Sequence, residues 1–112
     1  MEECIFCKIA AGEIPSDKVY EDNDFIAFND INPQAPTHIL VIPRRHIPSA
    51  ADMGKADCEL VGGMFLVAAE ICRQQKITDY RLVVNNGAGV GQTVFHIHLH
   101  VLAGRAFGWP PG

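Results

Sequence analysis

The chain has 112 residues and a formal net charge of −4, and 48% of its residues are hydrophobic against 20% charged. This length suits a single domain over residues 1–112 with a modest core, and the composition excludes a disordered chain. The negative charge argues against a nucleic-acid partner. Because no apolar run approaches the ~20 residues of a membrane span, we expect no membrane partner either.

The first residues carry the wrong charge for a secretory signal. Met1 is followed by Glu2 and Glu3, whereas a signal peptide begins with a positively charged region. We therefore expect a cytoplasmic protein, in which the four cysteines are reduced.

The first half of the chain predicts a short helix followed by three strands. The helix covers residues 4–11 and is ended by Gly12 and Pro15. Strands are expected at residues 19–21, 25–28 and 37–42, and a proline-containing loop joins the last two. The third of these strands is apolar and β-branched, so we expect it to be central, and Pro43 stops it.

A long helix is predicted from residue 55 or 57 to residue 76. Its apolar residues form two adjacent stripes at helical spacing, Leu60, Met64, Val67 and Ile71 in one and Val61, Phe65, Ala68 and Cys72 in the other. This apolar face is wide for a helix that covers one sheet, so we expect a second partner such as another subunit. Gly62 and Gly63 each cost the helix about 1 kcal/mol relative to alanine, and either close helix contact or drift accounts for them.

The last part of the chain predicts two more strands around a glycine loop. The strands cover residues 81–85 and 94–103, and the loop covers residues 86–91. Strands, then one helix, then more strands favour an α+β fold with an antiparallel sheet over a βαβ array. The tail at residues 108–112 is too rigid and aromatic to be mere fraying.

Three histidines at alternate positions, His96, His98 and His100, are the main chemical feature of the last strand. Alternate strand residues share a face, so the rings should lie on one face, roughly 6.6 Å apart, with Ile97 and Leu99 turned to the other. Rings this close cannot all be cationic, and a neutral imidazole beside protonated neighbours suits nucleophilic chemistry on a phosphate. Metal binding is the alternative, because clustered histidines are also common ligands.

Residues 85–93 are rich in glycine, which lets backbone N–H groups approach an anion. Gln92 and Thr93 add side-chain donors, although a flexible hairpin turn has the same composition. The segment matches neither common nucleotide-binding fingerprint. Asp30 in the proline loop could accept two ribose hydroxyls, and His38 could orient one of the rings. The alternatives are a turn-forming aspartate and a satisfied strand-end histidine.

Cys4 and Cys7 have the Cys-x-x-Cys spacing of zinc ligands, and His46 and His96 are candidates for the other two positions. A Cys2His2 set would be closed and tetrahedral, which is a structural zinc site. The alternative is a pair of small buried hydrophobes. A redox role is weaker, because that motif begins a helix that follows a strand.

Several sequence blocks in the same order resemble the histidine triad (HIT) family. The segment from His96 to Leu102 fits the family pattern His-φ-His-φ-His-φ-φ, where φ is apolar. The likeness covers nearly the whole chain, with further matches at residues 5–9, 28–31, 33–38, 91–94 and 109–112. The chain is most similar to the histidine triad nucleotide-binding branch. Thr93 stands where serine is usual in that branch, which we expect to alter the rate without loss of function.

This resemblance implies a fold, an assembly and an activity. The expected fold is a five-stranded antiparallel sheet with one long and one short helix, and the sheet should continue across a homodimer. The expected activity is hydrolysis of adenosine 5′-phosphoramidates and related purine nucleotides of the AMP type. His98 would attack the α-phosphate and form a covalent nucleotidyl-histidine, with no cofactor required for the chemistry.

The same resemblance assigns roles to other residues. His100 and the backbone near Thr93 would hold the phosphate oxygens, while His38 and His96 would orient and tune the reacting ring. Asp30 would bind the ribose. The base pocket would be walled by Phe6, Ile9, Phe28 and Ile31. The remaining nucleotide contacts would be Asn85, Gly91, Gln92, Thr93 and Leu99. Trp109 would reach toward the site of the partner subunit.

Cys4, Cys7, His46 and His96 also resemble the ligand set of zinc-containing family members. If His96 ligates zinc it cannot also be a free proton relay, so the metal and catalytic assignments of this ring compete. Two functions remain open beside the hydrolase. One is a nucleotide-sensing dimer with little turnover, and the other is a zinc-stapled structural protein.

Overall fold

The structure, a computed structural model, describes residues 4–112, and the acidic start of the chain lies outside them. The elements are α1 Ile5–Ala10, β1 Lys18–Glu21, β2 Phe25–Asn29, β3 Thr37–Pro43, α2 Cys58–Gln74, β4 Arg81–Val83 and β5 Leu99–Ala103. Short 3-10 turns lie at Ala50–Asp52, Lys55–Asp57 and Ala88–Val90. All neighbouring strands are antiparallel, in the order β1-β2-β3-β5-β4, so the predicted α+β fold with a five-stranded antiparallel sheet is confirmed.

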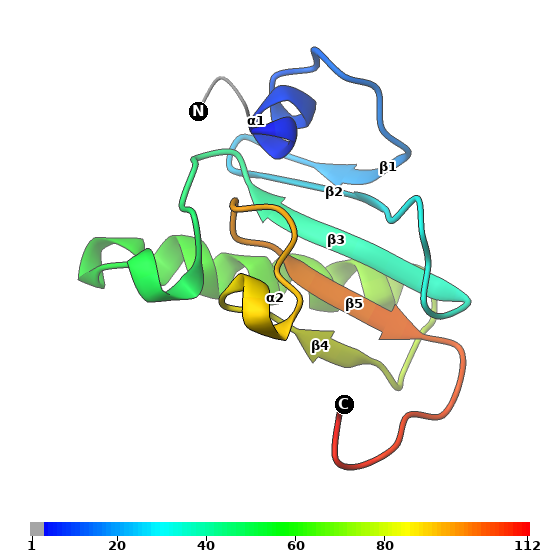
Figure 1. Ribbon diagram of the computed structural model, residues 1–112. Helices are drawn as coiled ribbons and strands as arrows, with labels where there is room; N and C mark the ends of the chain where they lie inside the picture. The colour runs from blue at the N-terminus through cyan, green and yellow to red at the C-terminus, as the bar shows by residue number, and fades with distance from the viewer. Residues whose placement is uncertain (1–3) are drawn as a thin grey trace.

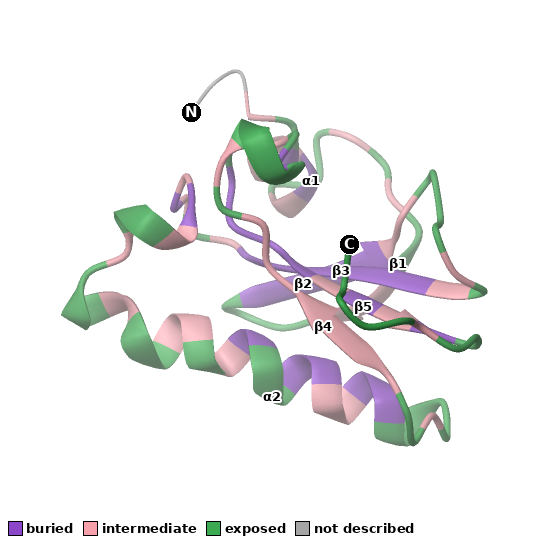
Figure 2. Ribbon diagram, turned by 60° about the horizontal axis from the view of Figure 1, so that its bottom comes forward, coloured by how far each residue is buried: buried purple, intermediate pink, exposed green. Residues whose placement is uncertain are grey.

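The sheet separates two apolar layers, because alternate strand residues point to opposite faces. In Figure 1, α2 lies behind the sheet and the loop that leads into β5 lies in front of it. On the α2 face, Met64, Val67 and Ile71 pack on sheet residues such as Val41 and Leu99. The α1 face has a smaller cluster, made of Phe6, Ile9, Ile26, Phe28, Leu40 and Ile42. Figure 2 shows the buried residues on the sheet and on the side of α2 that faces it.

The predicted strand at residues 94–103 is too long, because β5 begins only at Leu99. β5 pairs with β3 as far as Val41↔Leu99, so the second pair beyond it in this register would place Ile97 opposite Pro43. Proline has no N–H to donate, and the N–H of Ile97 instead donates to the carbonyl of Ile47 at 2.7 Å. The ladder therefore ends there, and residues 94–98 carry two of the three histidines on an irregular segment.

The other element boundaries lie close to their predicted positions. The strand expected at residues 81–85 ends at Val83, which pairs with His100. The long helix ends at Gln74, because Lys76 has a positive φ of 59° and the N–H of Ile77 returns to the carbonyl of Cys72 at 2.8 Å. Within residues 4–112, no helix combines the length and the apolar character needed to cross a bilayer.

The two glycines of α2 have different surroundings. A Cβ built on Gly63 would lie 2.5 Å from Cζ of Phe25, so the helix approaches β2 at a distance that only glycine allows. A Cβ built on Gly62 would meet nothing within 4 Å, and this residue is exposed. Close helix contact therefore explains Gly63, and nothing in the structure explains Gly62.

We predict opposite effects of alanine at these two positions. Gly63→Ala forces Phe25 or the helix to move and should lower the free energy of unfolding by about 1–3 kcal/mol. Gly62→Ala, the matched control, should raise it by up to about 1 kcal/mol through helix propensity. Urea titration measures both values. A Gly63→Ala protein as stable as the Gly62→Ala protein would contradict the close approach.

Candidate functional site

The three histidine rings lie on the α1 face of the sheet, as the alternation predicts. The Phe6 ring of α1 packs edge-on against the rings of His96 and His98, with centroids 6.0 and 5.1 Å apart. The centroids of the His98 and His100 rings are 4.9 Å apart, so these rings lean toward each other. The apolar residues between the histidines are buried in the core under α2.

The hydrogen bonds of His98 determine which of its ring nitrogens carries the proton. Nδ1 of His98 lies 2.8 Å from the carbonyl oxygen of His96. A carbonyl oxygen only accepts hydrogen bonds, so we assign the proton to Nδ1. In the neutral ring, Nε2 then keeps a free lone pair and can act as a nucleophile.

A second set of hydrogen bonds gives His100 the opposite tautomer. The backbone N–H of Gln34 donates to Nδ1 of His38 at 3.0 Å, so neutral His38 carries its proton on Nε2. This Nε2 lies 2.9 Å from Nδ1 of His100, and the Asp30 carboxylate is farther away at 3.4 Å. The His100 proton is therefore on Nε2, which is buried and has no partner among the described residues. His100 offers this N–H as a donor.

Burial keeps these rings neutral near pH 7. Desolvation, reinforced by neighbouring histidines, lowers the pKa of His96 and of His100 to about 4. Desolvation also lowers the pKa of His98 and of His38. The expectation of protonated rings beside a neutral one is therefore wrong, because the rings are too deeply buried to hold a charge. His100 is a donor because of its tautomer and not because of a positive charge.

His98 and His100 line a cavity of about 370 Å³ between α1 and the sheet. Eight of the predicted nucleotide contacts line it: Phe6, Ile9, Phe28, Asp30, Ile31, Thr93, His98 and His100. Larger hollows of about 740 and 540 Å³ lie at the two ends of α2, and neither contains a predicted site residue. The predicted residues thus converge on the smaller cavity.

Four predicted nucleotide contacts do not line this cavity. Gln92 is buried, and its side-chain amide bonds to three backbone groups of the surrounding loops, so it shapes the loop and has no group free for a ligand. The side chain of Leu99 lies in the core under α2, as strand alternation requires. Asn85 and Gly91 are neighbours of each other outside the cavity lining.

Two histidines predicted to be catalytic also stay outside the cavity lining. The His38 ring contacts His100, and the carbonyl of His96 accepts from His98. Both residues can therefore orient a ring that faces the cavity, whereas a direct contact of either ring with a bound molecule does not fit the structure.

Residues 14–17 line the cavity and were not predicted to do so. The Ser16 hydroxyl is buried there without a partner among the described residues. Asn29, another unpredicted lining residue, donates to the Asp17 carboxylate at 2.9 Å. The one available sequence signal is Pro15, which we interpreted, with Gly12, only as the end of the first helix.

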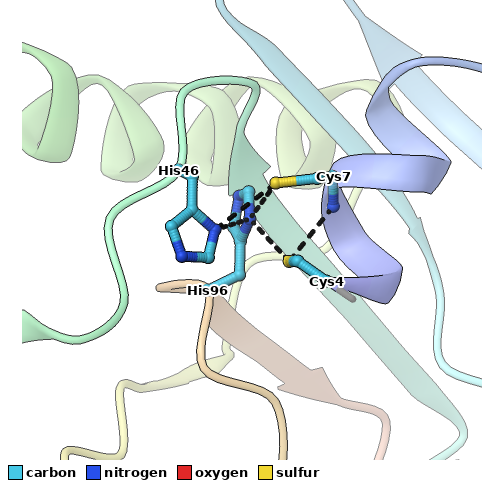
Figure 3. Close-up of side chains that lie close together, drawn as sticks. All are labelled: Cys4, Cys7, His46 and His96. Carbon is cyan, nitrogen blue, oxygen red and sulfur yellow. Dashed lines mark hydrogen bonds between the residues drawn. The ribbon is translucent and has the colours of Figure 1, made fainter. Parts of the chain in front are cut away.

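Cys4, Cys7, His46 and His96 converge at the start of α1 (Figure 3). Their sulfur and Nδ1 atoms all lie within 4.8 Å of one another. Nδ1 of His96 is 3.3 Å from the Cys4 sulfur, 3.5 Å from the Cys7 sulfur and 3.3 Å from Nδ1 of His46. Nδ1 of His46 is 3.3 Å from the Cys7 sulfur. The structure thus brings together all four predicted metal ligands.

The size of this cluster fits tetrahedral zinc. In a tetrahedral site, zinc bonds are about 2.05 Å to nitrogen and about 2.3 Å to sulfur. The ligand atoms are then about 3.3 Å apart for two nitrogens and about 3.6 Å apart for a nitrogen and a sulfur. The contacts within the cluster are 3.3–3.5 Å. Nε2 of His96 lies 2.7 Å from the Pro43 carbonyl, so Nε2 carries the proton and the lone pair of Nδ1 faces the cluster.

The other two cysteines lie outside this cluster, both on α2, where Cys58 is exposed and Cys72 is buried. Within the cluster, burial raises the pKa of the Cys7 thiol to about 11, and the neighbouring Cys4 adds to the effect. The free thiol is therefore protonated at neutral pH and must release its proton when it binds a metal.

Three comparisons with known proteins agree with the family resemblance that the sequence blocks indicate. A family model described as "Scavenger mRNA decapping enzyme C-term binding" matches residues 3–107. A HIT-like protein of Synechocystis is 52% identical over 99% of this chain and 98% of its own length. The purine nucleoside phosphoramidase of Escherichia coli K12 is 50% identical over 96% of this chain and 92% of its own. The crystal structure of a HIT family hydrolase from Legionella pneumophila superimposes with a TM-score of 0.95 at 48% identity, covering 98% of this chain and all of the other.

We predict that acid destabilises the protein through His100. Its pKa is about 4 when folded against 6.5 for a free histidine, so between these pH values the unfolded chain binds more protons. The free energy of unfolding should therefore fall as the pH drops from 6.5 toward about 4, by at most about 3 kcal/mol from this residue. His100→Gln should flatten the decline in urea titrations. An unchanged decline would contradict a buried neutral His100.

Proposed function

The chain belongs to the histidine triad (HIT) family of hydrolases, and from this premise we propose that it hydrolyses purine nucleoside phosphoramidates through a covalent nucleotidyl–His98 intermediate. The observation that carries the proposal is the hydrogen bond from Nδ1 of His98 to the carbonyl of His96. It leaves Nε2 unprotonated in a ring that lines the cavity, which is what attack on phosphorus requires. The phosphoramidase of Escherichia coli, at 50% identity, supports the substrate class.

The order of the strands suggests how a nucleotide lies in the cavity. His98 and His100 enter from the β5 side, and Asp30 follows β2 two strands away. A polar atom of the Asp30 carboxylate nevertheless lies within 4.8 Å of a ring nitrogen of His100, so a ribose at Asp30 would adjoin a phosphate held by His100. The base then lies among Phe6, Ile9, Phe28 and Ile31, the ribose hydroxyls at the Asp30 carboxylate, and the phosphate at His100 and Thr93.

The reaction then proceeds in two displacements at phosphorus. Nε2 of His98 forms a bond to the α-phosphorus, the phosphorus–nitrogen bond of the substrate breaks, and the amine takes up a proton from solvent as it leaves. Water next attacks the same phosphorus and loses a proton to solvent while the phosphorus–Nε2 bond breaks, so that AMP is released and neutral His98 is restored. The N–H of His100, which has no partner among the described residues, would donate to the phosphate oxygens in both steps, and a phosphate beside it would also raise its pKa.

We also propose that Cys4, Cys7, His46 and His96 hold one structural zinc ion. The contacts of the cluster match the edges of a tetrahedral zinc site, and four protein ligands leave no position for a reacting water. His96 would then serve as a metal ligand and a positioning residue, and not as a proton relay. Zinc binding requires reduced Cys4 and Cys7, which suits a reducing compartment such as the cytoplasm.

A homodimer whose sheet continues through β4 is the assembly that we propose. β4 ends the sheet, so its outer edge has no strand partner within residues 4–112. Two large apolar residues of α2 are exposed, Phe65 by 44% and Leu66 by 73%. Arg81 of β4 holds the tail through the carbonyl of Gly108 at 3.0 Å, and Trp109 beside it is 84% exposed. A second copy at this edge would cover these surfaces.

We predict that His98→Ala lowers the hydrolysis of a fluorogenic adenosine phosphoramidate on the order of 10³-fold or more, because it removes the covalent route. Denaturing the wild type at alkaline pH during turnover should trap a species heavier by one adenylyl group in mass spectrometry, because the phosphorus–nitrogen bond of a nucleotidyl-histidine survives in alkali, and the variant should yield none. Glu59→Ala, at an exposed position on α2, is the control and should retain activity.

Turnover retained by His98→Ala would contradict the proposed mechanism. A wild-type protein that binds AMP without detectable hydrolysis would instead favour the nucleotide-sensing dimer.

For the assembly, light scattering coupled to size-exclusion chromatography should give twice the chain mass of 12.3 kDa. The apolar surface of α2 and the open edge of β4 are the physical reason, since both would otherwise face water. A mass of one chain at assay concentrations would contradict the dimer.

A further inference from the structure

Cys4, Cys7, His46 and His96 connect a short helix to the sheet. Cys4 and Cys7 lie at the start of α1, whereas His46 follows β3 and His96 precedes β5 (Figure 3). α1 has only six residues, too few to be stable as an isolated helix. Its position therefore depends on what attaches it to the rest of the protein.

The same helix forms one wall of the cavity. Ile5, Phe6 and Ile9 of α1 line it, and the first two lie between the cysteines in sequence. A shift of Cys4 or Cys7 therefore moves two residues of the wall directly.

The remaining attachments of α1 hold its side and its C-terminal end. The guanidinium of Arg44 donates to the carbonyl of Ala10 at 2.6 Å. Phe6 and Ile9 are buried against the sheet, whereas Ile5 is 46% exposed. At the N-terminal end, Phe6 packs on the rings of Phe28 and His98, and the cysteines with their histidine partners make the polar attachment.

The reacting ring has separate support. Nε2 of His96 donates to the Pro43 carbonyl at 2.7 Å, and the N–H of Ile97 donates to the Ile47 carbonyl at 2.7 Å. These two bonds hold the His96 carbonyl, which accepts from His98, in addition to the contacts that Nδ1 of the same ring makes with the two cysteines. Loss of the cluster should therefore disturb the cavity wall more than the nucleophile.

From this asymmetry we propose that zinc in the cluster positions the α1 wall and so sets the affinity for the nucleotide, while the rate of the chemical step stays nearly constant. This inference rests on the proposed function and on zinc occupancy. Coupling between two sites is reciprocal, so bound nucleotide must strengthen zinc binding by the same factor. Cys4, Cys7 and His46 are then positioning residues for substrate binding.

The test compares the zinc-loaded wild type with the double variant C4S/C7S. Serine preserves the helix N-cap, in which the Cys4 side chain accepts from the N–H of Cys7, and removes the thiolates. Atomic emission measures zinc, calorimetry measures the Kd of AMP, and turnover of an adenosine phosphoramidate gives kcat and KM. We expect one zinc per chain in the wild type and none in the variant. In the variant, the Kd of AMP and KM should rise at least about fivefold, with kcat within about twofold.

Two controls separate positioning from general stability. Cys58→Ser changes an exposed cysteine outside the cluster. This variant should bind one zinc per chain and keep the wild-type Kd of AMP, kcat and KM. In the wild type, saturating AMP should lower the Kd of zinc, which competition with a chromophoric chelator measures. The factor should equal the one by which zinc lowers the Kd of AMP. Circular dichroism checks the folding of C4S/C7S. If it is unfolded, His46→Ala should raise the Kd of AMP, and His46→Cys, which restores a fourth ligand, should return it.

An equal Kd for AMP in the zinc-loaded and zinc-free proteins would overturn the inference, and so would a wild type without zinc. A fall in kcat at constant KM would also overturn it, because the effect would then lie on the chemical step. Zinc-loaded wild type that does not bind AMP would contradict the proposed function itself.

Discussion

One hydrogen bond, from Nδ1 of His98 to the carbonyl oxygen of His96 at 2.8 Å, determines what the site can do. It orients the ring and assigns the proton to Nδ1, so that Nε2 is free. The carbonyl is available because β5 starts only at Leu99 and β4 ends at Val83, so neither strand reaches His96. The early end of the sheet ladder thus produces the geometry of the His98 ring.

The site obtains its polarity from neutral groups. His38 and His100 form a chain of hydrogen bonds that begins at a backbone N–H and ends at an unpartnered ring N–H. Burial prevents these rings from becoming cationic, since their charged forms would lose hydration. In such a low-dielectric site a fixed neutral donor interacts strongly with an anion, and none of the donors would have to reorient in the proposed reaction. A chain with a net charge of −4 can thus offer an anion site without a cluster of cations.

The sequence predicted what depends on local pattern and missed what depends on pairing and burial. Alternation placed the three rings on one face, and Cys-x-x-Cys spacing with two histidines identified a cluster that the fold brings together. The effect of Pro43 on the neighbouring strand was missed, because it depends on register. Gln92 was predicted to bind the nucleotide, whereas its amide bonds to the backbone of the surrounding loops. The sequence alone does not distinguish an amide that binds a ligand from one that is buried in a loop. Ser16 joins the cavity only through the path of its loop, which has no periodic signal.

The central claim is that neutral His98 carries its proton on Nδ1. Nitrogen-15 NMR of the histidine side chains at neutral pH tests it directly, because protonated and unprotonated ring nitrogens have well-separated chemical shifts. The account predicts a protonated Nδ1 and an unprotonated Nε2 for His98, with the opposite assignment for His100. A His98 ring protonated on Nε2, or on both nitrogens, would contradict it.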